Sequence, residues 1–274
     1  LPLCLMKSLH NLAPFSAAGV ASVGIVLVAM LVRCLDGSYN EGGQFHNDIS
    51  IDHRPEFGHE NHAFSTAVLP FACMVYQGLL MHYNSPRFFV ELKDPTIPRF
   101  AQSTVYAFGL CTCLYIAIAA AGYLTFGSNS DSYILNNYSP NDPLATVGRL
   151  CVVFSTVITY PLAFFGVRDG CLDLLDAPQE WRDGNAISVI LLIAITVVAM
   201  LISDLGFINA VAGGLFCTLL CCVIPAIMYR RAVWKSLHKT RGQRCEVLLV
   251  LTLMVLGVLL GGTGVYKSIA RAFQ

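Results

Sequence analysis

Seven apolar runs, each long enough to cross a lipid bilayer, constrain this chain more than any other feature. They cover residues 14–35, 64–90, 100–126, 144–166, 186–203, 207–229 and 247–267. A helix needs about 20 apolar residues to cross a hydrocarbon core of about 30 Å. Charged residues are correspondingly scarce, at 12% of 274 residues, against about 25% in a soluble domain. We therefore predict an all-α membrane protein with a single transmembrane domain over residues 1–274.

The run 64–90 cannot be a plain helix, because 27 helical residues would be about 40 Å long. Pro86 lacks the N–H that would bond to the carbonyl of His82, and its ring disfavours helical geometry at Ser85. Non-helical backbone at membrane depth must be packed in protein or line a wet cavity. We predict a broken helix of the kind that binds substrates in solute carriers. A proline-kinked packing helix is the alternative. The polar residues around the expected break are Gln77, His82, Tyr83, Asn84 and Ser85.

The run 144–166 carries hydroxyl groups beside a second proline. Ser155, Thr156 and Thr159 lie within about one helical turn, and Pro161 leaves the carbonyl of Val157 without a helical partner. Oxygen donors of this kind suit a Na⁺ ion. The alternative is that the hydroxyls bond to carbonyls of their own helix, as they usually do in membrane helices.

Lysine and arginine are unevenly distributed over the connecting loops, which sets the orientation. One side of the membrane has only Arg33, Arg54, Lys267 and Arg271, and Arg149 is unassigned. The richer side is therefore cytoplasmic and includes Leu1, which argues against a G-protein-coupled receptor. Its residues are Lys7, Arg87, Lys93, Arg99, Arg168, Arg182, Arg230, Arg231, Lys235, Lys239, Arg241 and Arg244. The basic segment 229–244 could contact lipid headgroups, although the orientation rule alone explains it.

Two outer loops carry residues of interest. Asn137 begins an Asn-Tyr-Ser glycosylation sequon, which the following Pro140 weakens. The loop 36–63 holds four histidines, whose spacing fits no closed metal motif. A pH-sensing role is one interpretation of them and a solvated loop is the other. The histidines are His46, His53, His59 and His62.

Glycines and cysteines suggest close helix packing. Gly257 and Gly261 have the GxxxG spacing of a packing seam, residues 117–122 offer a small-residue face, and Gly213, Gly214 and Pro225 permit kinking. Cysteines within the apolar runs are expected to act as small buried hydrophobic residues. These are Cys73, Cys111, Cys113, Cys151, Cys217, Cys221 and Cys222.

The motifs together resemble the amino acid/auxin permease family. The resemblance rests on residues 1–9, on His82 to Asp94, on Gly122 to Phe126, on Arg149 to Arg168 and on the Asp-Leu-Gly-Phe at 204–207. It covers nearly the whole chain in the same order. The sodium-coupled neutral amino acid transporters and the vacuolar amino acid transporters are the most similar branches.

The resemblance implies an inverted-repeat (5+5) transporter fold with eleven helices, of which seven would be present here and one is broken at its middle. The first four helices would then be missing, and with them half of the substrate site. It implies that Met81, His82, Tyr83 and Asn84 face substrate. It also implies that Ser155, Thr156 and Thr159 supply oxygen atoms to a cation. Where many relatives have proline after the histidine, this chain has Tyr83, so coupling to Na⁺ or H⁺ stays open, and His82 is the candidate for proton coupling.

We therefore expect secondary active transport of an amino acid by alternating access, in the plasma membrane or a vacuolar or lysosomal membrane. A transporter-like amino acid sensor and a truncated product without transport are the alternatives. The chain contains no phosphate-binding loop, metal cluster or nucleophile–base pair that would indicate an enzyme. Beyond the coupling ion we expect no cofactor. The zero net charge suggests no nucleic-acid partner.

Overall fold

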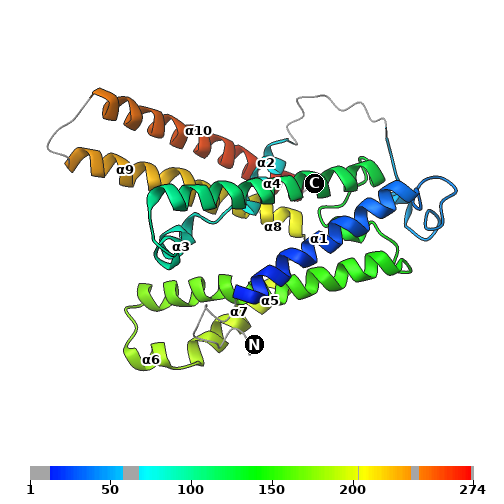
Figure 1. The fold of residues 1–274 in the computed structure, drawn as a ribbon, viewed down its shortest axis with the longest axis horizontal. Coiled ribbons are helices and arrows are strands. Elements are labelled where there is room, and N and C mark those ends of the chain that lie inside the picture. The colour runs from blue at the N-terminus through cyan, green and yellow to red at the C-terminus, as the bar shows by residue number, and fades with distance from the viewer. Residues whose placement is uncertain (1–12, 58–67, 203, 236–240, 273–274) are drawn as a thin grey trace. The chain divides into compact units, whose positions relative to one another are not determined.

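The structure is a computed structural model that describes residues 13–57, 68–202, 204–235 and 241–272 (Figure 1). Helices account for most of these residues, and the β structure in this part is one isolated bridge between Glu56 and Gly127. The chain divides into two compact units. Unit 1 comprises residues 1–59 and 113–203, and unit 2 comprises residues 60–112 and 204–274. Helix α4 (Ile97–Phe126) contributes to both units.

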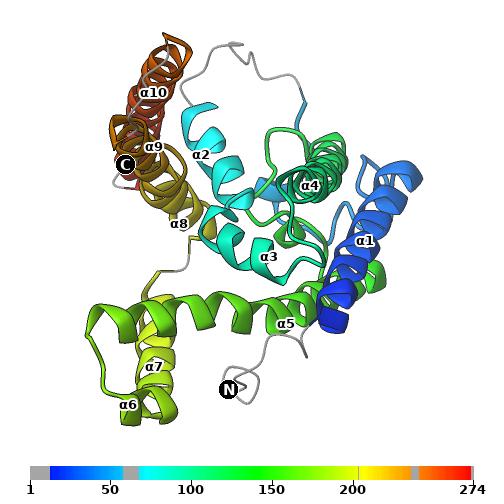
Figure 2. The same ribbon diagram turned by 60° about the vertical axis from the view of Figure 1, so that its left-hand side comes forward.

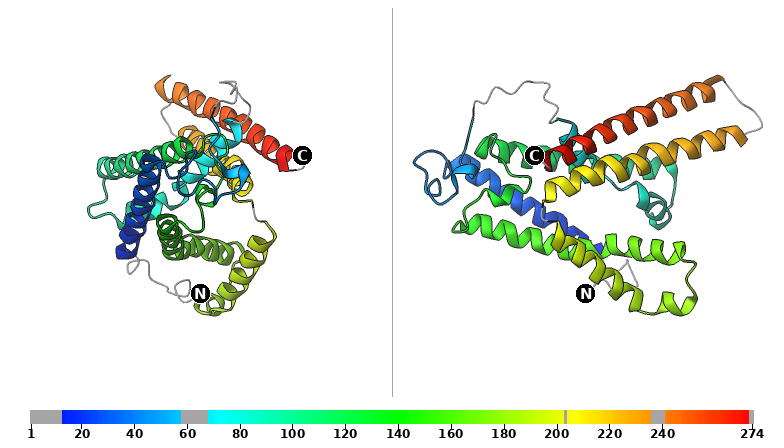
Figure 3. Two further views of the ribbon diagram at one scale, coloured as in Figure 1. Left: turned by 90° about the vertical axis from the view of Figure 1, so that its right-hand side faces the viewer. Right: turned by 180° about the vertical axis from the view of Figure 1, so that it is seen from behind.

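Unit 1 is organised around a long helix pair. Helix α1 (Ala13–Asp36) lies along α5 (Pro143–Leu174), as Figures 1 and 3 show. Helices α6 (Gln179–Asp183) and α7 (Ala186–Leu201) follow α5. The loops after α1 and α4 each contain one 3₁₀ turn, at Ile51–His53 and Ile134–Asn136.

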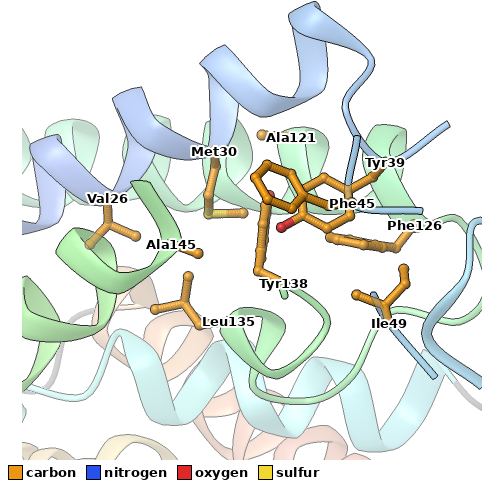
Figure 4. Close-up of a cluster of buried hydrophobic side chains, with 10 residues drawn as sticks. All are labelled: Val26, Met30, Tyr39, Phe45, Ile49, Ala121, Phe126, Leu135, Tyr138 and Ala145. Carbon is orange, nitrogen blue, oxygen red and sulfur yellow. The ribbon is translucent and has the colours of Figure 1, made fainter. Parts of the chain in front are cut away.

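The core of unit 1 is aromatic where these two loops meet the helices (Figure 4). The ring of Tyr39 lies 5.3 Å from that of Phe126 and 5.1 Å from that of Tyr138, both edge to face. Phe45 stacks on the other side of Tyr39 at 5.6 Å. Edge-to-face rings at these distances stabilise a core beyond the area they bury. The loops are therefore parts of the packed unit.

Unit 2 combines an early segment of the chain with its C-terminal part. It comprises α2 (Val68–Gly78), a 3₁₀ turn (His82–Asn84), α3 (Ser85–Glu91), α8 (Leu205–Ala212), α9 (Ile224–Lys235) and α10 (Arg241–Ala272). Between α8 and α9 runs a π-helical segment, Gly213–Val223. Helix α10 packs along the π-helical segment, and α2 packs against α8 and α10 (Figure 2).

Glycines allow these helices to approach closely, as the sequence predicted. A side chain at Gly213 would collide with the backbone carbonyl of Cys73, and one at Gly261 would collide with Thr218 and the carbonyl of Gly214. Gly257 faces Cys222 in the same way. The GxxxG pair is therefore a seam inside this unit. At the place where the sequence permits a kink, the structure has the π-helical segment. Its wider turns end two residues before Pro225.

Within the described residues, five helical stretches are long and apolar enough to cross a membrane: Ala17–Asp36, Ile97–Phe126, Pro143–Leu174, Leu205–Lys235 and Gly242–Arg271. Val68–Gly78 and Ala186–Leu201 are apolar but shorter. Each of the seven predicted runs thus overlaps one of these helices. The helix expected to end near residue 166 continues to Leu174, and in this extension the buried Arg168 donates to the carbonyls of Arg182 and Gly184.

The expectation that cysteines in apolar runs are buried holds for Cys73 and Cys217 and is wrong for Cys111 and Cys113. The two exposed cysteines lie on α4, whose apolar window is only 11% buried. A helix surface turned away from the protein suits a thiol in an apolar run equally well.

Candidate substrate and cation sites

The helix in the run 64–90 is broken, but one turn earlier than the sequence predicted. Helix α2 ends at Gly78, and Met81 has φ −134° and ψ 3°, outside regular helix. The expectation that Pro86 forces Ser85 out of helical geometry is wrong, since Ser85 has φ −54° and ψ −44°. Pro86 instead lies in the first turn of α3, where the missing N–H costs no helical bond. The proline thus starts a helix after the break.

The break is held by thiols of the π-helical segment. The Sγ atom of Cys221 lies 3.0 Å from Nδ1 of His82. The thiol of Cys217 donates to the side-chain carbonyl of Gln77 at 3.0 Å. Gln77 and His82 therefore each meet a sulfur atom from a segment some 140 residues away. A third contact joins Tyr76 Oη and Cys222 Sγ at 3.2 Å.

These thiols were missed as site residues, because they were interpreted only as small hydrophobic residues. Cys217 and Cys221 are four residues apart and therefore share one side of a helix. That spacing was the available signal. The sequence could not indicate which segment this side faces.

The other residues expected at the substrate site lie on the same turn. The carbonyl of Met81 accepts hydrogen bonds from the backbone N–H of Asn84 and, at 3.4 Å, from the hydroxyl of Ser85. His82 is exposed, and Met81 and Asn84 are half-buried. The side chain of Tyr83 lies outside the described part of the chain. The structure thus brings this set together on one non-helical turn of unit 2.

The hydroxyls predicted to bind a cation lie in the middle of α5, in unit 1. The hydroxyl of Thr159 donates to the carbonyls of Ser155 at 2.9 Å and Thr156 at 3.5 Å. This is the alternative that the sequence left open, although an oxygen atom that donates a proton can still coordinate a cation through its lone pairs. The hydroxyl of Ser155 faces α1 at Gly19, and Thr156 is exposed.

A buried ion pair at the N-terminus of α5 was not predicted from the sequence. Arg33 donates to both carboxylate oxygens of Asp142, at 2.8 and 2.7 Å, and the side chain of Asp142 is fully buried. The hydroxyl of Tyr39 donates to the same carboxylate at 2.9 Å. Asp142 also accepts from the backbone N–H of Leu144 and so caps α5. The carboxylate thus joins α1, the following loop and α5.

The electrostatics of Asp142 follow from these contacts. Burial by itself raises the pKa of this carboxyl group. The hydrogen bonds from Arg33 and Tyr39, together with the charge of Arg33, outweigh burial and hold the pKa below its usual value. Asp142 is therefore ionised in the folded protein at neutral pH.

The candidate glycosylation site at Asn137 is buried. Its side-chain amide donates to the carbonyl of Asn129 at 2.7 Å, and its side-chain oxygen accepts from the backbone N–H of Asp131 at 2.8 Å. A glycan on this nitrogen would disrupt both contacts. The sequon stays a prediction, and the burial argues against it.

The histidines of the outer loop do not form a cluster in the described part. His53 lies 4.0 Å from a carboxylate oxygen of Asp131, and Nδ1 of His46 lies 3.1 Å from the carbonyl of Tyr39. His59 and His62 lie outside the described residues. No group of three or more metal-binding side chains occurs within the described residues.

Comparison with known proteins places these features in a family. The model of the family described as transmembrane amino acid transporter protein matches residues 1–270. The chain belongs to this family. This family and the curated relatives are transporters and not enzymes.

Curated relatives of this transporter-family chain cover most of its length. It is 28% identical over 260 residues to a zebrafish (Danio rerio) protein named "Putative sodium-coupled neutral amino acid transporter 11", covering 94% of this chain and 54% of the relative. The human (Homo sapiens) protein of that name is 24% identical and is matched over 53% of its length, by 84% of this chain. "Amino acid transporter AVT1E" of Arabidopsis thaliana is 23% identical, with 99% of this chain and 48% of the relative covered. The chain thus spans about half the length of these relatives, and no solved structure matches it.

Proposed function

We propose that the protein moves an amino acid across a membrane by secondary active transport. The helix break between Gly78 and Ser85 is the observation that carries this proposal. Its unwound turn supplies backbone N–H and C=O groups, and an ionisable His82 lies on the turn. Such a break in an otherwise apolar run suits the α-carboxylate and α-ammonium of an amino acid. Met81, His82, Tyr83 and Asn84 are the proposed substrate contacts.

Alternating access requires the substrate site to open to one side of the membrane at a time. Hydrogen bonds to neutral thiols are weak, so the contacts of Cys217 and Cys221 with the break can be exchanged at low cost. The close glycine contact between α10 and the π-helical segment is more rigid than the contacts of these thiols with the break. We propose that the break region moves while this seam stays intact.

The coupling ion is Na⁺ or H⁺ in this proposal. Na⁺ would use the oxygen atoms of Ser155, Thr156 and Thr159 and the carbonyl of Val157, which Pro161 leaves unbonded. H⁺ would use His82, the ionisable side chain on the turn. The words "sodium-coupled" in the names of two relatives favour Na⁺. The membrane would be the plasma membrane or a vacuolar or lysosomal one, with Leu1 on the cytoplasmic side.

The test is uptake of radiolabelled amino acids into proteoliposomes that contain the full-length protein. Na⁺ and H⁺ gradients are imposed separately, and wild type is compared with Thr159→Val. We expect uptake to follow the Na⁺ gradient and the variant to lose that dependence, because valine keeps the shape and removes the oxygen atom.

Uptake that follows only the H⁺ gradient and is unchanged in Thr159→Val would reassign coupling to His82. Saturable binding without accumulation under either gradient would contradict transport and support the alternative, an amino acid sensor. Thr146→Val is the matched control. The hydroxyl of this threonine also donates to a carbonyl near it in the chain, that of Asp142 at 2.9 Å, but Thr146 lies at the N-terminal end of α5 and far from Thr159 in the helix.

A further inference from the structure

A pocket of about 340 Å³ lies between α9 and α10 in unit 2. The lining side chains are of two kinds, cationic and apolar. Arg230 and Arg244 come from the two facing helices, and a valine from each helix and one tryptophan complete the wall. Among the residues that the structure describes, the lining contains no carboxylate and consists of Arg230, Val233, Trp234, Arg244 and Val247. The pocket is therefore positively charged on an apolar base.

The depth of the pocket matches the boundary between hydrocarbon and headgroups. One candidate span ends at Lys235 and the other begins at Gly242. Arg230 lies five residues inside the first end and Arg244 two residues inside the second, which is about 8 and 3 Å along a helix axis. Arginines near the ends of membrane helices extend toward the interface, and tryptophan is enriched there.

The charges around the pocket point to an anionic occupant. Arg231 and Lys235 follow on α9 close to the lining residues. The nearby Glu246 of α10 accepts a hydrogen bond from Tyr229. Guanidinium groups bind phosphate oxygens with paired hydrogen bonds. A free, fully hydrated ion has no apolar surface that could cover the apolar wall. The glycerol and upper acyl carbons of a lipid would cover it.

We propose that this pocket binds one anionic phospholipid from the leaflet that the distribution of basic residues assigns to the cytoplasm. Arg230 and Arg244 hold the phosphate and headgroup, while Val233, Val247 and Trp234 cover the upper part of the acyl chains. The bilayer supplies the ligand at high local concentration. This site does not depend on the transport proposal.

Tryptophan fluorescence tests the site directly, because Trp234 lines the pocket and the chain has 2 tryptophans. The full-length protein is prepared with Trp234 as its single tryptophan, so Trp181 and any others are replaced by phenylalanine. It is reconstituted in bilayers in which brominated phosphatidylserine or brominated phosphatidylcholine acts as quencher at equal mole fraction. We expect phosphatidylserine to quench more strongly, with about a fivefold preference per arginine.

The Arg230→Gln/Arg244→Gln variant should remove this preference. Lys93→Gln/Arg99→Gln loses the same charge on the same predicted side of the membrane and should keep it. Equal quenching by the two lipids would overturn the proposal, as would a preference that survives in the pocket variant or disappears equally in the control. Reversal of the preferential quenching by millimolar inorganic phosphate would mean that the pocket binds the free ion instead of a lipid.

Discussion

At the scale of single residues, His82 and Cys221 show how a thiol can determine the geometry of a polar group. The Sγ to Nδ1 distance of 3.0 Å is short for a hydrogen bond involving sulfur. If the thiol is the donor, the neutral imidazole carries its hydrogen on Nε2, which is then the nitrogen that can donate to a carboxylate. Cys221 would thereby orient a proposed substrate contact without touching substrate itself.

Replacing Cys221 with alanine should therefore weaken amino acid transport. We expect the KM for uptake to rise about twofold, corresponding to the roughly 0.5 kcal/mol at the weak end of the range for one hydrogen bond. Cys221→Ser should keep most of the affinity, since a hydroxyl can make the same bond. Cys245→Ala, which removes an exposed thiol of α10, serves as the control. Serine and alanine variants with the same KM would contradict the hydrogen-bonding role.

At the scale of elements, the contact between α10 and the π-helical segment depends on the absence of side chains. Gly214 and Gly261 approach each other so closely that a Cβ atom on either would contact the backbone of the other. Gly264, also on α10, comes equally close to the side chain of Cys73 on α2. Packing of this kind depends on van der Waals contact and small residues, because lipid provides no hydrophobic force between helices.

Gly261→Ala should lower the unfolding temperature of the detergent-solubilised protein, because overpacking costs about 1–3 kcal/mol. The neighbouring Gly262 is the matched control, since nothing lies within 4 Å of a Cβ built there. Gly262→Ala should leave stability unchanged or raise it by up to about 1 kcal/mol through helix propensity. Thermal unfolding followed by circular dichroism measures both. Equal effects of the two substitutions would contradict the seam.

At the scale of the whole molecule, tolerance of acid should depend on Asp142. The pKa of this carboxyl group is lowered in the folded state from its usual value of 3.8. The contribution of the group to stability is therefore fully present above about pH 4 and is lost as the pH falls through the lower, folded-state pKa.

The Asp142→Asn variant should lose about 3 kcal/mol at neutral pH, because it removes the buried carboxylate that pairs with Arg33 and leaves that arginine only its partly exposed ion pair with Asp36. Its unfolding temperature should then fall less steeply than that of wild type below pH 4. Asp94→Asn is a suitable control, since Asp94 pairs with Arg99 on the surface, where ion pairs contribute about 0–1 kcal/mol. Parallel acid profiles for wild type and Asp142→Asn would exclude this carboxylate as the cause.

Much of the fold was predictable because its signals are local. Each of the seven apolar runs overlaps an apolar helix, and a family resemblance read from short motifs is confirmed by the match over residues 1–270. The glycine seam also follows from spacing on one helix. The predicted position of the helix break was wrong by about one turn, because Pro86 can start a helix as readily as it can interrupt one.

Hydropathy and helical periodicity depend only on neighbouring residues, so they were enough to predict a helical membrane protein. The amino acid transporter family was suggested by the resemblance of short motifs, which are also local in the sequence. Only the tertiary structure decided which side chains meet. The contacts of Cys221 with His82 and of Arg33 with Asp142 join residues more than 100 positions apart. Such pairs depend on which helix faces lie together, and the pattern of a single helix shows that it has an apolar or polar face without showing what that face contacts.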